Sequence, residues 1–143
     1  MKTNILKKIC MNNSIALAYL FGSQAEAGLR SLKNHDVKPS DSLADLDVAV
    51  LFEQGLPAPN QVTKLYACLH NQLSDLFIPF SLDLVFLQEH HSVFQAQVIM
   101  GICIYAKDEV WKSDFEEDVL RRAADFKPFL DKFFEERLEE IEL

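Results

Sequence analysis

Cysteine, basic residues and long apolar runs are scarce in this sequence, and each shortage argues against a class of protein. The three cysteines, Cys10, Cys68 and Cys103, are widely spaced and form no Cys-x-x-Cys pair, so neither a disulfide framework nor a zinc site is indicated. We expect them to be reduced packing residues. Lys and Arg number 14 against 22 Asp and Glu, a formal charge of −8. Because phosphate backbones are held chiefly by Lys and Arg, we do not expect direct nucleic-acid binding.

The hydrophobic run at residues 15–21 is too short to span a bilayer, and no small-residue cleavage site follows it. We therefore expect a cytoplasmic protein without membrane contact. The acidity suits a basic protein partner, although acidity also serves solubility. At 143 residues, with eleven Phe, the chain is long enough for one domain with a substantial hydrophobic core.

Carboxylates are placed in two predominantly apolar runs. Asp45 and Asp47 are two residues apart, so in an extended strand both side chains leave one face while Leu46 and Val48 leave the other. Asp83 occupies the same kind of position in a later run. Three carboxylates on one sheet face repel each other unless a cation lies among them. Mg²⁺ takes oxygen ligands and bridges carboxylates to substrate phosphates, so it is the expected cation.

A glycine and a serine follow the first predicted strand, residues 16–21. Gly22 and Ser23 turn the chain there into a short helical stretch at 24–27. Glycine lets the backbone approach a ligand closely, and free N–H groups at a helix start favour phosphate. Ser23 adds a hydroxyl donor. This turn is therefore a predicted phosphate-binding element.

The succession of Gly22-Ser23, Asp45-x-Asp47 and Asp83 resembles the signature of the DNA polymerase β-like nucleotidyltransferase superfamily. More narrowly, the chain is similar to the minimal nucleotidyltransferases, short domains often encoded as the antitoxin beside a HEPN-domain ribonuclease toxin. The resemblance covers about residues 15 to 106. It implies a small mixed sheet with packed helices, Gly22 and Ser23 as nucleotide-binding residues, and the three aspartates as catalytic and metal-binding residues.

The activity that this resemblance implies is Mg²⁺-dependent transfer of AMP from ATP to a hydroxyl of a HEPN toxin, which is thereby neutralised. We expect that hydroxyl to belong to a tyrosine. Two alternatives stay open: an antitoxin of weak activity that acts by binding alone, and transfer to a small-molecule hydroxyl. Many family members carry arginines just after Gly-Ser and a serine before the first Asp. Here those positions are Gln24, Glu26 and Ala44, which favours the binding-only alternative.

The segment between Ser23 and Asp45 is longer than is usual in the family. Residues 28–42 are rich in Ser, Asn, Asp, Lys and Gly, so we predict a surface loop that folding does not require. Three basic side chains within it either reach the triphosphate or are simply solvated: Lys33, His35 and Lys38.

The other periodic segments predict an α/β fold of alternating helices and strands. The expected elements are a helix at 3–11, strands at 45–52, 81–87 and 102–106, a helix capped by Asn60, and a short helix at 93–99. His90 and His91 are adjacent and point apart, so helix entry or a surface position is expected rather than a metal site.

The last stretch, Ser113 to Leu143, is predicted to be an acidic amphipathic helical segment. Ser113 and Glu116 match a capping box, and Pro128 must kink the helix or begin a second one. We therefore divide the single domain into a nucleotidyltransferase part, 1–110, and a C-terminal helical extension, 111–143. Either a basic partner completes this extension, or it packs as an ordinary helix with a solvated acidic face.

Overall fold

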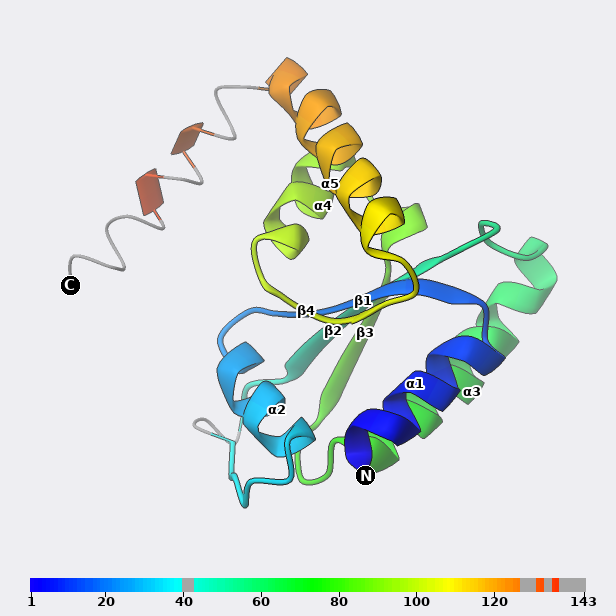
Figure 1. The fold of residues 1–143 in the computed structure, drawn as a ribbon, viewed down its shortest axis with the longest axis vertical. Helices are drawn as coiled ribbons and strands as arrows, with labels where there is room; N and C mark the ends of the chain where they lie inside the picture. Colours follow the sequence, from blue (N-terminus) through cyan, green and yellow to red (C-terminus); the bar gives the residue numbers. More distant parts are fainter. Residues whose placement is uncertain (40–42, 127–130, 133–134, 137–143) are drawn as a thin grey trace.

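The computed structural model of this chain describes residues 1–39, 43–126, 131–132 and 135–136. None of the helices in these ranges combines the length and apolarity needed to cross a bilayer. Helices and strands alternate along the chain (Figure 1). Their order is α1 (Lys2–Asn12), β1 (Ile15–Phe21), α2 (Ala25–Leu32), β2 (Leu46–Phe52), α3 (Pro59–Leu76), β3 (Leu82–Phe86), the 3-10 turn η1 (Leu87–Glu89), α4 (Ser92–Ile99), β4 (Ile102–Ala106), α5 (Glu109–Ala123) and the 3-10 turn η2 (Ala124–Phe126).

The four strands form one mixed sheet in the order β3-β2-β1-β4. β1 runs antiparallel to both β2 and β4, whereas β2 and β3 are parallel. The predicted mixed sheet is therefore confirmed, and each predicted strand lies within one residue of its observed bounds. β1 and β2 occupy the centre of the sheet and are almost entirely buried, which explains their nearly continuous apolar sequence.

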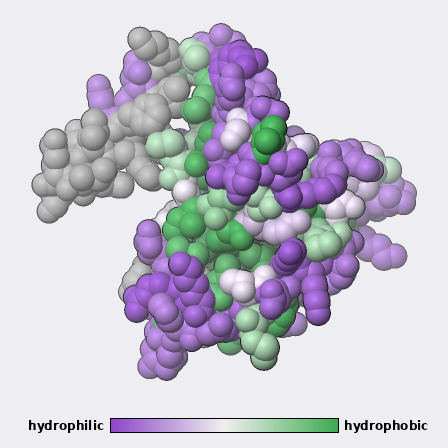
Figure 2. Space-filling model, viewed as in Figure 1, coloured by the Kyte–Doolittle hydropathy of each residue, from purple (hydrophilic) through white to green (hydrophobic). Residues whose placement is uncertain are grey.

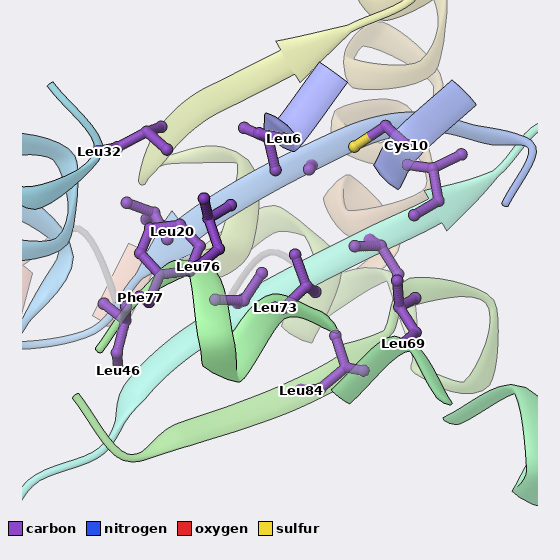
Figure 3. Close-up of a cluster of buried hydrophobic side chains, with 14 of the residues drawn as sticks. Leu6, Cys10, Leu20, Leu32, Leu46, Leu69, Leu73, Leu76, Phe77 and Leu84 are labelled. Carbon is purple, nitrogen blue, oxygen red and sulfur yellow. The ribbon is translucent and has the colours of Figure 1, made fainter. Parts of the chain in front are cut away.

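Helices cover both faces of the sheet (Figure 1). One face packs against α1, α2 and α3 through the main core, part of which Figure 3 shows, with leucines of the strands facing leucines of α1 and α3. The other face carries a smaller cluster that α4 and α5 cover. In the view of Figure 2, hydrophobic residues gather across the middle, where Figure 1 shows β4 and β1, and hydrophilic residues cover the surrounding helices.

The predicted loop at 28–42 is wrong for its first five residues, because α2 continues to Leu32. Gly28, Ser31 and Leu32 are buried. A Cβ at Gly28 would lie 2.6 Å from Leu46 Cδ1, so the absence of a side chain lets α2 pack closely on β2. Residues 33–39 contain neither helix nor strand, and 40–42 lie outside the described residues.

Two predicted helix starts are also wrong. α5 begins four residues before Ser113, where the Asp108 carboxylate accepts a hydrogen bond from the Val110 N–H at 2.8 Å. Asp108 satisfies a free N–H group at the helix start and so sets its position.

α3 begins at Pro59, with no side-chain cap at the preceding residue, because the fixed φ of proline suits the first helical position. Asn60 therefore lies inside the helix. Pro128 lies outside the described residues, and the division into 1–110 and 111–143 stays a prediction.

The cysteines and histidines follow the sequence interpretation only in part. Cys10, Cys68 and Cys103 are free, as expected, but Cys68 is exposed on α3 and is not a packing residue. His91 caps α4 by accepting a hydrogen bond from the Val93 N–H, which confirms helix entry for one member of the histidine pair.

Candidate active site

Strand pairing brings residues from three parts of the sequence to one end of the sheet. Phe21, the last residue of β1, is paired with Asp47 of β2, and Asp47 is paired with Asp83 of β3. Because residues directly opposite each other on neighbouring strands project from the same face, these three side chains lie side by side. The predicted meeting of carboxylates from two strands is thus present in the fold.

Gly22 lies directly against the Asp47 carboxylate. A Cβ at position 22 would be 2.3 Å from Asp47 Oδ2, closer than any side chain could be accommodated there. The backbone at Gly22 also has a φ of +78°, which favours glycine. Only glycine at this turn therefore allows the carboxylate its observed place.

The Asp47 carboxyl holds a proton more tightly than a free aspartate does. Its pKa is raised from 3.8 to about 6, first by burial, then by the Asp83 charge and a hydrogen bond to the Asp83 side chain, and least by the Asp45 charge. Asp47 is half-buried, whereas Asp45 and Asp83 are exposed. Two carboxyl groups in hydrogen-bonding contact favour retention of one proton between them until a cation replaces it.

The acidic pair, Asp47 and Asp83, fits a magnesium ion by the chemistry of its donors. Mg²⁺ is bound in many enzymes by one or two carboxylates, with water and substrate phosphates as the remaining ligands. Within the described residues, no three acidic, histidine or cysteine side chains converge into a metal site by themselves. Asp45 precedes β2 by one residue, and its charge helps to raise the pKa of Asp47. Water and substrate phosphate oxygens would therefore complete the coordination shell of an ion held by this pair.

Ser23 and Gln24 link the glycine turn to the start of α2. Gln24 is almost fully buried, with 1 % of its surface exposed, and its Nε2 donates to Ser23 Oγ at 3.4 Å. The sequence marked Gln24 only as a missing arginine, whereas the structure shows that it contacts the predicted phosphate-binding hydroxyl. Glu26 is exposed in the first turn of α2, where its charge competes with phosphate for the helix dipole.

A cavity of about 330 Å³ lies at the opposite end of the sheet from the acidic pair. It is lined by residues of α1, the beginning of β1 and the ends of β2 and β4, including Ser14, Glu53 and Lys107. None of the predicted site residues lines it. The acidic pair lies at the other end of the sheet, with Asp83 exposed and Asp47 half-buried, and the chemistry of these side chains identifies the candidate site.

The family model described as Polymerase beta, Nucleotidyltransferase matches residues 4–110. The chain belongs to this nucleotidyltransferase family. The matched range contains Gly22, Ser23 and the three aspartates, whose individual roles remain predictions. No curated protein matches this nucleotidyltransferase significantly by sequence.

Solved structures of toxin–antitoxin complexes contain chains with the same fold. One comes from an MntA-HpeT mutant in which two aspartates are changed to glutamate (18 % identity, 94 % of this chain and 99 % of that chain, TM-score 0.60). Another comes from a toxin–antitoxin with AMP-PNP (19 % identity, 94 % of this chain and 99 % of that chain, TM-score 0.59). A third comes from a complex of a tri-AMPylated Shewanella oneidensis HEPN toxin with MNT antitoxin (21 % identity, 93 % of this chain and 96 % of that chain, TM-score 0.53). At these identities the likeness shows the fold, and it confirms the predicted nucleotidyltransferase architecture.

The basic side chains that were candidates for triphosphate contact lie after α2. Lys33, His35 and Lys38 are all exposed in the described segment 33–39, and their contact with a triphosphate stays a prediction.

Proposed function

We propose that this nucleotidyltransferase is a cytoplasmic antitoxin that transfers AMP from ATP to a hydroxyl of a HEPN-family toxin and thereby neutralises it. The observation that carries the proposal is the acidic pair held against the Gly22 turn, with the Asp47 pKa raised to about 6. The solved relatives support it, since one contains AMP-PNP and another contains an AMPylated HEPN toxin with its MNT antitoxin.

Asp45 and Asp47 would hold Mg²⁺, with Asp83 as a further ligand or as a base. When bound, the ion supplies charge neutralisation for the triphosphate. The Ser23 hydroxyl and backbone N–H groups at the start of α2 would bind the β- and γ-phosphates.

The chemistry is displacement at the α-phosphorus of ATP. The acceptor oxygen forms a bond to that phosphorus, the bond to the oxygen bridging the α- and β-phosphates breaks, and pyrophosphate leaves. Asp83 accepts the proton of the attacking hydroxyl as general base. Because Asp83 is exposed on an edge strand, a hydroxyl of another protein can reach it from solvent.

The test is incubation of the pure protein with ATP, Mg²⁺ and the HEPN protein encoded beside it, followed by intact-mass spectrometry of both chains. We expect the partner to gain the mass of one or more AMP groups. The Asp83→Asn variant should add none, while the same variant should still bind the partner. An unmodified partner after incubation with the wild-type protein would contradict AMP transfer.

Neutralisation by binding alone is the second candidate, and one observation favours it. Gln24, at a position where many family members carry arginine, is an uncharged and buried side chain, so it supplies no positive charge to a triphosphate. The two candidates separate in one assay: if Asp83→Asn still abolishes toxin ribonuclease activity, binding alone is sufficient.

A further inference from the structure

Three aromatic side chains from different elements meet on the sheet face that carries the acidic pair. The rings of Phe94 of α4 and Phe21 of β1 form an edge-to-face contact, with centroids 5.8 Å apart and an interplanar angle of 89°. His90, directly after η1, stacks on Phe94 with centroids 4.5 Å apart and an angle of 30°. Phe21 and Phe94 are half-buried and His90 is exposed, so this aromatic row borders solvent.

The aromatic row begins beside the acidic pair. Phe21 is the direct cross-strand neighbour of Asp47, and Val85 lies on the same face two residues after Asp83. Cross-strand neighbours have Cβ atoms about 5 Å apart, and the Phe94 ring centroid lies 5.8 Å from that of Phe21. A nucleotide whose phosphates lie at Gly22 and the acidic pair can thus extend its sugar and base over Phe21 toward His90.

We infer that His90, supported by Phe94, is the stacking surface for the nucleobase of the nucleoside triphosphate substrate. This inference rests on the proposed nucleotidyl transfer and adds the part of the site that the motif residues do not supply. One face of the imidazole lies on Phe94, so the opposite face is the one open to a planar ligand. His90 makes the contact, and Phe94 is a positioning residue.

A nucleobase is the ligand class that matches this surface. Every base has an aromatic face, and stacking on an aromatic side chain provides affinity without base-specific hydrogen bonds. Hydrophobic packing accounts for Phe21 and Phe94, which both lie against the cluster under α4 and α5. It does not account for an exposed imidazole stacked at the outer end of a row that begins at the acidic pair.

The adjacent histidine provides a matched control. His91 is also exposed, but its ring accepts a hydrogen bond from the Val93 N–H and meets the edge of Phe126 of η2. His91→Ala therefore removes a helix cap and an aromatic contact from the same short segment without removing the stacking surface. Comparison of His90→Ala with His91→Ala therefore distinguishes a general loss of stability, which both variants would show, from loss of ligand contact, which only His90→Ala would show.

The experiment is isothermal titration of wild type, His90→Ala, His91→Ala and Phe94→Leu with AMP-PNP and with inorganic tripolyphosphate, each with Mg²⁺. Tripolyphosphate has the phosphates but no base. We expect His90→Ala to weaken AMP-PNP binding about tenfold, as loss of one base-stacking contact does, and to leave tripolyphosphate affinity unchanged. Phe94→Leu should show the same selective loss, and His91→Ala should keep both affinities. Circular dichroism melts of each variant serve as the control for folding.

The outcomes distinguish this inference from the function on which it rests. If wild type binds both probes and His90→Ala changes neither affinity, or weakens both equally, His90 does not hold the base, while the phosphate site stands. If wild type binds neither probe, the proposed nucleotidyl transfer and the stacking surface both fail.

Discussion

Replacing Asp47 by asparagine removes the charge that the site accommodates least well when no cation is bound. In the folded chain the Asp47 pKa is raised from 3.8 to about 6. The folded state therefore binds this proton more tightly than the unfolded chain does. By linkage, the contribution of Asp47 to the free energy of unfolding is fully present below pH 3.8 and is lost as pH rises through about 6. At pH 8 the ionised Asp47 carboxylate thus destabilises the metal-free protein.

The size of this effect follows from the change in pKa. A change from 3.8 to about 6 corresponds nominally to about 3 kcal/mol. Asp47 is only half-buried, so solvent screening reduces the expected value to about 1 kcal/mol. Asparagine keeps the shape of the side chain without the charge. Asp47→Asn should therefore be about 1 kcal/mol more stable at pH 8, or about 2–4 °C in Tm, and the gain should nearly vanish at pH 4.

The assay is urea and thermal denaturation of both proteins at pH 4 and pH 8 without divalent ions, repeated at pH 8 with Mg²⁺. Magnesium binding to the folded state should stabilise wild type and narrow the gap, while nucleotidyl transfer by the variant falls by orders of magnitude. Asp45→Asn is the control, because Asp45 is exposed and should give a smaller gain. A stability change that is equal at the two pH values would refute the electrostatic reasoning, and wild-type transfer activity in the variant would refute the mechanism.

Three further outcomes are expected. Gly22→Ala should lower the free energy of unfolding by about 1–2 kcal/mol, because φ is +78° there, and should displace the Asp47 carboxylate that lies 2.3 Å from the new Cβ; unchanged urea melts and nucleotide affinity would contradict this. Replacing residues 33–42 by a short connector should change Tm little. Gly28→Leu should lower Tm, because α2 packs closely on β2 at Gly28. If the connector variant melts at a lower temperature than Gly28→Leu, residues 33–42 belong to the core and the contact at Gly28 does not. Removing residues 128–143 should leave the fold intact and weaken toxin binding, more at low salt than at high salt; equal affinities would mean that this segment packs internally.

The sequence by itself determined the strands and the family. Apolar runs of five to seven residues are the local signal of buried strands, and β1, β2, β3 and β4 were predictable to within a residue. The glycine–serine turn and the aspartates were also predictable from local sequence, because polar residues and glycine within or directly after an apolar run mark positions with a special role. These features depend on neighbours along the chain.

Helix ends and the length of α2 were less predictable, because composition competes there with packing. Gly28 and Ser31 belong to residue types common in loops, yet both are buried in α2 against the sheet. Gly28 is needed because Leu46, distant in sequence, occupies the space beside it. Similarly, both Ser113 and Asp108 are residue types that cap helix starts. Asp108 is the actual cap, because α5 begins soon after β4 ends.

Only the tertiary structure decided how the site residues meet. The register that places Phe21, Asp47 and Asp83 in one row depends on pairing between strands that are far apart in sequence. The raised Asp47 pKa follows from that row, since burial and a second carboxyl group cannot be read from a single strand. The histidine pair divides in the same way: His91 caps α4, while His90 stacks on Phe94 at the end of the row that begins at the acidic pair. Adjacent residues of one type thus acquire different roles because the backbone at the start of α4 directs their rings toward different neighbours.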